Sequence, residues 1–268
     1  MVRDLLARGA AALSSAGVDT PRLDAELLLA EAIGVSRAGL AMAAREEVAA
    51  DARERFDELL ARHVEREPVA YLLGRREFRR LTLSVDPRVL IPRPETELLV
   101  EVGLELPGGC RVVDVGTGSG AVALALKDER PDLAVAGVDV DPGAIEVARA
   151  NGERLGLDVE WVCGDLLDGI GRCDAVLANL PYVGTSDPVD LEVGYEPARA
   201  LFAGSDGLAA IGRLVEQVRA RTDVSLLALE VGLDQADAVA SLVAGAGFAA
   251  VERLRDLAGA ERVIVARR

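Results

Sequence analysis

The sequence predicts an α/β protein in which a doubly wound, mostly parallel sheet follows a small helical N-terminal domain. Strand-like and helix-like runs alternate from residue 111 onward, whereas residues 1–72 carry apolar side chains at helical spacing. Half of the residues are hydrophobic but only 3% are aromatic, so the core must consist mainly of Ala, Val and Leu. Ala and Leu favour helices and Val favours strands, which is the composition of a mixed fold.

The first clear helix begins at Thr20-Pro21, because threonine caps a helix and proline is tolerated in its first turn. Gly34 is its stop signal. The residues expected on its apolar face are Leu23, Leu27 and Ala30.

A later helix carries apolar residues with Glu and Arg between them, at Phe56, Leu59, Leu60 and Val64. The single histidine, His63, lies beside this stripe. We expect it to pack between helices, since no second histidine exists to share a metal ion. Residues 1–72 are therefore predicted to form a helical domain.

Residues 73–93 change character and are predicted to form a β-hairpin linker. Apolar residues alternate with polar ones, the period of a half-buried strand, at Phe78, Leu81, Leu83, Val85, Val89 and Ile91. Asp86-Pro87 is a turn signal in the middle of this run. Pro92 and Pro94 then open a helix that runs to about Glu105 and begins the third region, residues 94–268.

The third region alternates strands with helices, which implies a parallel sheet covered on both faces. Its expected strands are Arg111–Val115, Ala134–Asp139, Val159–Val162, Asp174–Ala178 and Leu226–Val231, followed by an antiparallel pair, Ala249–Leu254 and Arg262–Ala266. One expected helix ends at about Arg130 and a second begins at Pro142. A third spans about Leu208–Arg221, and a fourth follows Asp234.

Charge and cysteine content exclude several classes of function. The formal net charge is −15, and an acidic protein repels the phosphates of a nucleic acid. Cys110, Cys163 and Cys173 form no C-x-x-C pair, so neither a zinc site nor a disulfide framework is expected, and we predict no metal. No apolar run is long enough to cross a membrane, and the charged N-terminus does not resemble a signal peptide, so we expect a cytoplasmic protein.

A glycine-rich loop between a predicted strand and a predicted helix is the first candidate site. It consists of Gly116, Thr117, Gly118, Ser119 and Gly120. Glycines let the backbone approach a ligand closely, and Asp139 ends the next strand, where a carboxylate can accept hydrogen bonds from both ribose hydroxyls of an adenosine. Asp165, followed by Leu166, lies past the third strand and is placed to reach the adenine edge. This spacing does not separate NAD from S-adenosylmethionine (SAM), and a tight turn without a ligand is a further alternative.

The second candidate site is the tetrapeptide Asn179-Leu180-Pro181-Tyr182, which ends the fourth strand. Asn offers a carbonyl acceptor and an NH2 donor, carbonyls beside a proline are free to accept, and Tyr offers a flat face. Together they suit a planar substrate that bears an NH2 group. An ordinary Asn-Pro loop turn is the alternative.

At these residues the sequence resembles glycine-loop methyltransferases that act on amide or exocyclic nitrogens, and most closely the peptide chain release factor glutamine methyltransferases. The resemblance covers nearly the whole chain, and its most specific piece is the run from Ile91 to Glu97 (Ile-Pro-Arg-Pro-Glu-Thr-Glu). Other matching segments are Glu67–Tyr71 with Gly74, Glu196-Pro197, Ala200-Leu201, Gly204, Asp206-Gly207, Glu230–Gly232 with Gln235, and Arg262-Val263.

The resemblance implies a class I, Rossmann-like methyltransferase that uses SAM and methylates the side-chain amide nitrogen of a protein glutamine. The implied partner is a class-1 peptide chain release factor, gripped in part by residues 1–72, and we expect a monomer that contacts no nucleic acid or membrane directly. The family's usual Asn-Pro-Pro-Tyr is Asn-Leu-Pro-Tyr here, so the second position keeps its backbone carbonyl and loses the fixed φ of proline.

Four alternatives remain open at this point. A glutamine of a ribosomal protein is the nearest. An adenine N6-methyltransferase on DNA or RNA comes next, since some enzymes acting on ribosomal RNA also carry Asn-Leu-Pro-Tyr, but the acidic charge counts against it. A nicotinamide oxidoreductase would have no use for the tetrapeptide, and a non-catalytic binding module would not need both motifs.

Overall fold

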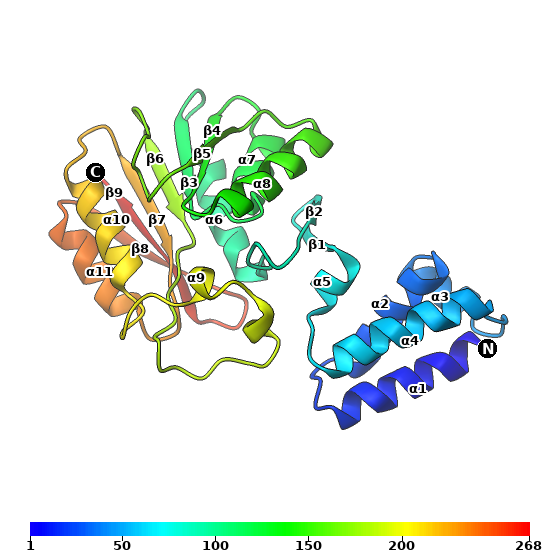
Figure 1. Ribbon diagram of the computed structural model, residues 1–268. Coiled ribbons are helices and arrows are strands. Elements are labelled where there is room, and N and C mark those ends of the chain that lie inside the picture. Colours follow the sequence, from blue (N-terminus) through cyan, green and yellow to red (C-terminus); the bar gives the residue numbers. More distant parts are fainter. The chain divides into compact units, whose positions relative to one another are not determined.

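The structure is a computed structural model that describes residues 1–268. It contains two compact units. The helical unit consists of Met1–Arg75 together with Val189–Tyr195, and the sheet unit consists of Arg76–Pro188 together with Glu196–Arg268. Figure 1 shows the helices of the first unit in blue to cyan and the sheet of the second. No helix combines the length and the apolar character that crossing a membrane requires.

The helical unit is built from five helices: α1 (Val2–Ser15), α2 (Pro21–Ile33), α3 (Arg37–Met42), α4 (Ala50–Val64) and α5 (Val69–Leu73). The predicted start and end of α2 are confirmed, with proline in the first turn and Gly34 as a left-handed cap. Its predicted apolar face is confirmed at Ala30, which is buried, and wrong at Leu23. Leu23 is exposed, and Leu28 and Leu29 are fully buried, because the Leu-Leu-Leu run offers several helical faces and packing selects one of them.

His63 is completely buried between α2 and α4, as a helix-packing residue should be. Its Nδ1 donates to the carbonyl of Glu67 at 2.9 Å, and its Nε2 lies 3.3 Å from the Asp24 carboxylate. Burial lowers the pKa of His63, but the bonds to Asp24 and Glu67 raise it, and the net pKa lies above the ordinary value.

The hairpin is present, but its turn is not at Asp86-Pro87. Strands β1 (Arg75–Phe78) and β2 (Leu81–Ser84) form a two-stranded sheet. The turn is Arg79-Arg80, with Arg79 at a φ of 50°. Val89 and Ile91 are buried without belonging to a strand. The alternation of apolar residues therefore reflects burial of their side chains. Strand pairing of the backbone ends at Ser84, before Pro87.

The sheet unit has seven strands in the order β5-β4-β3-β6-β7-β9-β8. They are β3 (Arg111–Val115), β4 (Ala134–Asp139), β5 (Glu160–Cys163), β6 (Ala175–Ala178), β7 (Leu226–Glu230), β8 (Ala250–Arg255) and β9 (Glu261–Arg267). The first five in this order are parallel, and β9 is antiparallel to both of its neighbours. The predicted mostly parallel sheet with an antiparallel final pair is confirmed.

Helices cover both faces of this sheet. They are α6 (Glu97–Leu104), which follows the short 3-10 helix η1 (Pro94–Thr96), then α7 (Ala121–Glu129), α8 (Pro142–Leu155), α9 (Ala198–Leu201), α10 (Ala209–Arg219) and α11 (Ala236–Gly245). The remaining 3-10 helix, η2 (Val193–Tyr195), belongs to the helical unit. The sequence patterns had not predicted α9, because four residues are too few to show a helical period.

Successive strand residues point to opposite faces, and the core divides accordingly. Val113 and Val115 of β3 join the layer formed with α10 and α11, whereas Val112 joins the layer formed with α6 and α7. Leu227 and Leu226 of β7 divide in the same way. Figure 1 shows α10 and α11 side by side on one side of the sheet. Both faces are covered by buried apolar side chains, so the carboxyl edge of the strands is left as the place for a ligand.

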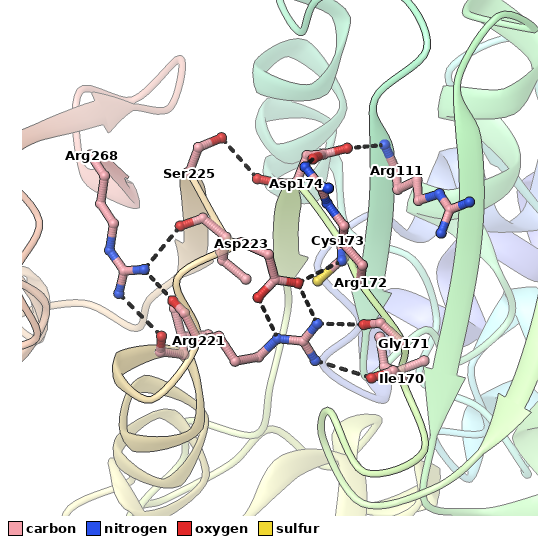
Figure 2. Close-up of polar contacts among 12 residues, drawn as sticks. Arg111, Ile170, Gly171, Arg172, Cys173, Asp174, Arg221, Asp223, Ser225 and Arg268 are labelled. Carbon is pink, nitrogen blue, oxygen red and sulfur yellow. Dashed lines mark hydrogen bonds and ion pairs between the residues drawn. The ribbon is translucent and has the colours of Figure 1, made fainter.

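A polar network holds the opposite edge, where the parallel strands begin (Figure 2). The Arg221 guanidinium donates to the carbonyls of Ile170 and Gly171 and pairs with Asp223 at 2.6 Å. Asp223 also accepts from the backbone N–H of Cys173 at 2.9 Å. These contacts join the loop before β6 to the loop before β7.

Two further ties complete this edge. Arg268, which follows β9, donates to the carbonyl of Val218 at 3.1 Å and so caps the last turn of α10. The Asp174 carboxylate accepts from the backbone N–H of Arg111 at 2.8 Å, and the Ser225 hydroxyl donates to the Asp174 carbonyl at 3.0 Å. Three neighbouring strands are thereby fixed at their starts, which keeps their carboxyl ends in register.

Asp223→Ala should destabilise the sheet unit without affecting ligand binding at the other edge. It leaves the Cys173 N–H and the Arg221 guanidinium without their acceptor, which costs about 1–3 kcal/mol of unfolding free energy. The Arg221 hydrogen bond holds the pKa of Asp223 well below its ordinary value. Its contribution is therefore present above the unfolded pKa of about 4 and is lost as pH falls below it. Urea unfolding at pH 7 and pH 3 measures both effects, and an unchanged midpoint at pH 7 would contradict them.

Candidate active site

The strand register places the three predicted signals next to one another. Val115, the last residue of β3, pairs with Val138 on β4 and with Ala178 on β6. Gly116, Asp139 and Asn179 therefore leave three adjacent strands at the same carboxyl edge. The strand order reverses between β3 and β6, and open α/β sheets bind ligands at such a point.

A pocket of about 300 Å³ opens at this edge. Among the residues predicted from sequence, it is lined by Gly116, Gly118, Asp139, Asp165, Leu166, Asn179, Leu180 and Pro181. Thr117 and Ser119 are buried behind the loop instead, and neither Gly120 nor Tyr182 lines the pocket. The glycine loop and the tetrapeptide thus both line one cavity. The residues of each motif that do not line it lie behind the lining residues or beside them.

Asp114 is the main support of the glycine loop. Its buried carboxyl accepts from the Thr117 hydroxyl at 2.6 Å and from the Ala123 N–H, in the first turn of α7, at 3.2 Å. Burial raises the pKa of Asp114 to about 7, although these two bonds lower it. The turn from β3 into α7 is therefore shaped by a carboxyl below the loop, and the side chain of Thr117 turns inward to meet it.

Gly116 is needed because the tetrapeptide lies directly against it. Its φ is 75°, a value that side chains rarely adopt. A Cβ added there would stand 3.0 Å from the Asn179 carbonyl oxygen and 3.1 Å from Cδ2 of Leu180. The two motifs are consequently in contact through their backbones, with no side chain of the loop between them.

Asp139 combines burial with free acceptor capacity. One carboxylate oxygen accepts from the Gly118 N–H at 3.0 Å and the other from the Asp141 N–H at 2.9 Å. Burial raises the pKa of Asp139 above its ordinary value, against the effect of these bonds. The Val140 N–H also lowers the pKa of this carboxyl. A carboxylate offers about four lone-pair sites, so capacity for a further donor from a ligand remains.

The far wall contains Asp165 and Leu166. Asp165 forms an ion pair with Arg213 of α10, so its charge is already partly compensated. Leu166 has a φ of 57°, an uncommon conformation for a leucine. Strained backbone of this kind concentrates at ligand sites, where the surrounding structure enforces it.

The tetrapeptide is held from three sides. Asn179 donates from Nδ2 to the Thr96 hydroxyl oxygen at 3.1 Å. The Gln235 amide donates to the Tyr182 carbonyl at 2.9 Å. The Tyr182 hydroxyl donates to the Glu230 carboxyl at 3.5 Å, and burial raises the pKa of Tyr182 to about 12. The Tyr182 phenol therefore stays neutral. Because Asn179 contacts Thr96 through Nδ2, its side-chain oxygen Oδ1 takes no part in that contact.

Glu196 joins the two sides of the pocket mouth. Its nearly buried carboxylate accepts from the Ile91 N–H at 3.0 Å and pairs with Arg93. Residues 88–90 on one side of this clamp line the pocket, as do Pro197 and Arg199 on the other.

Thr96, Glu196, Glu230 and Gln235 were not predicted as site residues. Each lies in a segment that carried the family resemblance, and this was the only signal for them in the sequence. Their roles depend on partners far along the chain, so no local pattern indicated them.

Comparison with known proteins adds two matches to family models. Residues 4–74 match the PrmC N-terminal domain, and residues 94–203 match the methyltransferase small domain. A release factor glutamine methyltransferase of Deinococcus radiodurans is 40% identical over 274 residues, covering 100% of this chain and 98% of the relative. Another, of Pseudomonas aeruginosa, is 45% identical, covering 91% of this chain and 92% of the relative.

A solved methyltransferase structure from Pyrococcus furiosus has the same fold. It superimposes with a TM-score of 0.54 at 18% identity, covering 69% of this chain and 87% of the other. At this identity the likeness concerns the fold alone.

Proposed function

Because the chain belongs to the release factor glutamine methyltransferase family, we propose that it transfers a methyl group from SAM to the side-chain amide nitrogen of a protein glutamine. The proposed substrate is the glutamine of the Gly-Gly-Gln loop in class-1 peptide chain release factors. The observation that carries this proposal is the single pocket lined by Gly116, Asp139 and Asn179. The edge proposed to bind adenosine and the tetrapeptide proposed to bind the amide both line it, as a transfer between two substrates requires.

The residues around the pocket fit SAM. Gly116 and Gly118 present bare backbone, Asp139 has spare acceptor sites for ribose hydroxyls, and Asp165 with Leu166 forms the wall proposed for the adenine. Thr117, Ser119 and Gly120 shape the loop, and Asn179 borders both substrates. When bound, SAM supplies a methyl group activated on a sulfonium.

The residues of the tetrapeptide would align the glutamine. An amide nitrogen is a poor nucleophile because its lone pair is delocalised into the carbonyl. Asn179 Oδ1 and the Leu180 carbonyl would accept the two hydrogens of the NH2 group, Pro181 would rigidify the turn, and Tyr182 would pack beside the amide plane. Positioning of this kind is the main catalytic contribution that the site offers.

The remaining features of the proposal concern the setting of the reaction. Residues 1–72 would bind the release factor outside its glutamine loop, and residues 94–268 would catalyse the methyl transfer. Residues 73–93 would link these two domains. The net charge of −15 supports a protein substrate over a polyanion. We propose a cytoplasmic location, because the proposed substrate is a soluble translation factor. We also propose that the protein is a monomer.

Mass spectrometry of purified substrates tests the function. Enzyme and labelled SAM are incubated separately with release factor, ribosomal protein and RNA. We expect one methyl group on the Gly-Gly-Gln glutamine and none on RNA at low or high salt. Label on a ribosomal protein glutamine would change the substrate, and label on adenine without any on glutamine would refute the proposal.

Removal of residues 1–75 should separate cofactor binding from substrate recognition. A chain that starts at Arg76 keeps the whole pocket lining, so we expect SAM affinity within about threefold of the full chain, a difference under 1 kcal/mol. Methylation of intact release factor should fall by about 100-fold or more, since binding energy away from the reacting group is lost. Calorimetry and single-turnover assays measure the two effects. Full activity of the truncated chain would contradict a partner-binding role for residues 1–72.

A further inference from the structure

A buried carboxyl lies directly behind the tetrapeptide. Leu229 of β7 pairs with Ala178 of β6, so Glu230 stands beside Asn179 at the next position of the adjacent strand. Glu230 is only 2% exposed. The Tyr182 hydroxyl donates to its Oε1, and its Oε2 completes no hydrogen bond. A buried acceptor left open in this way is costly, which favours a functional reason for keeping it.

Thr96 connects this carboxyl to Asn179. Thr96 is 4% exposed at the start of α6, and its hydroxyl oxygen accepts from Asn179 Nδ2. The Thr96 hydroxyl also interacts with the Glu230 carboxyl and lowers its pKa. Oε2 of Glu230 has no hydrogen-bond partner, so it is an acceptor still open to a donor. The Thr96 hydroxyl can donate one hydrogen bond, and Oε2 of Glu230 can accept it.

The protonation state of Glu230 decides the direction of this chain of hydrogen bonds. An ionised carboxyl only accepts, so Thr96 donates to it and must accept from Asn179. The Asn179 amide then turns Nδ2 toward Thr96 and Oδ1 toward the pocket. A protonated Glu230 can donate to Thr96, which allows Thr96 to donate to Oδ1 and turns Nδ2 toward the pocket. An incoming NH2 group meets an acceptor in the first case and a donor in the second.

We propose that Glu230 is a positioning residue that acts through Thr96 to fix the amide of Asn179 with its oxygen toward the NH2 group of the substrate. This inference rests on the proposed function only in that the acceptor carries an NH2 group. Protonation of Glu230 removes the bias and slows transfer.

The charges around Glu230 place this switch near neutral pH. The net pKa of Glu230 is raised to about 7, with burial as the largest cause and the charge of Glu95 acting in the same direction. Thr96, Arg262 and Tyr182 act in the opposite direction. Arg262 is held by Asp256 at 2.9 Å, and Tyr182 stays neutral because its own pKa is about 12. Glu230 is therefore expected to change charge near neutral pH.

Single-turnover methylation at saturating SAM, from pH 5.5 to 9, tests the proposal. The wild-type rate should rise with pH and level off above an inflection near 7. Glu230→Gln should remove the inflection and lower the rate at pH 8 by about tenfold or more, with little change in KM for release factor. Saturating SAM matters because Asp114, below the glycine loop, also has a pKa of about 7 and would act through cofactor binding.

Three variants separate positioning from a structural role. Thr96→Val should lower the rate as Glu230→Gln does, and Thr96→Ser should retain the wild-type rate. The double variant that combines Thr96→Val with Glu230→Gln should be no slower than either single variant. Glu216→Gln, an exposed glutamate on α10, is the matched control and should keep the wild-type profile.

Stability gives an independent readout. A carboxyl with a raised folded pKa destabilises the fold as pH rises above the unfolded value, so Glu230→Gln should melt at the same temperature as the wild type or higher at pH 8. A retained inflection, a wild-type rate, or a loss of SAM affinity that accounts for the slower rate would overturn the proposal. If wild-type enzyme labels adenine instead, the proposed function fails, and Glu230→Gln is judged by the same profile on that acceptor.

Discussion

Asn179→Ala should abolish methyl transfer while leaving SAM binding intact. The side chain borders the pocket, and its Oδ1 is the acceptor that would hold one hydrogen of the glutamine NH2. Without it the amide is free to rotate away from the line of attack, and misplacement of this kind lowers the rate by about 100-fold or more. The alanine keeps the backbone carbonyl of residue 179, which touches Gly116, so the glycine loop should stay in place.

Rates and affinities must be measured together for this variant. Single-turnover methylation of release factor gives the rate, and calorimetry gives the affinity for SAM. Leu180→Pro is the informative companion, because only the backbone carbonyl is used at that position and activity should be retained. A loss of SAM affinity equal to the loss of rate would move Asn179 from the acceptor site to the cofactor site.

Asp139→Ala should weaken SAM binding by about tenfold or more, since each charge-assisted hydrogen bond contributes roughly 1.5–3 kcal/mol. The loss has two sources. The ribose hydroxyls lose their proposed acceptor, and the Gly118 N–H loses the contact that ties the glycine loop to β4. The turnover of bound substrates should change less than the affinity, because the tetrapeptide is held by other residues.

Asp139→Asn distinguishes the two sources. An asparagine keeps one acceptor for the Gly118 N–H and lacks the negative charge and second acceptor that two ribose hydroxyls need. We expect its affinity to lie between those of wild type and Asp139→Ala. Calorimetry measures all three, with thermal unfolding as the control for folding. Wild-type affinity in Asp139→Ala would place the ribose contact elsewhere.

Several errors of the sequence patterns have a common physical cause. The alternation from Phe78 to Ile91 predicted one long hairpin, but only its first half pairs as strands. The face of α2 was predicted correctly at Ala30 but not at Leu23, which is exposed while Leu28 is buried. Periodicity reports which residues are apolar, and the choice among apolar residues is made by the surface against which they pack.

The sequence by itself determined that Gly116, Asp139 and Asn179 share one edge. Each follows a strand in an alternating strand and helix pattern, and parallel strands all end at the same edge of their sheet. The tertiary structure alone decided which buried polar groups support that edge. Thr96 meets Asn179 across 83 residues, and Arg93 meets Glu196 across 103. A buried polar group must find a partner, but that partner is selected by how distant segments pack, and no local pattern records it.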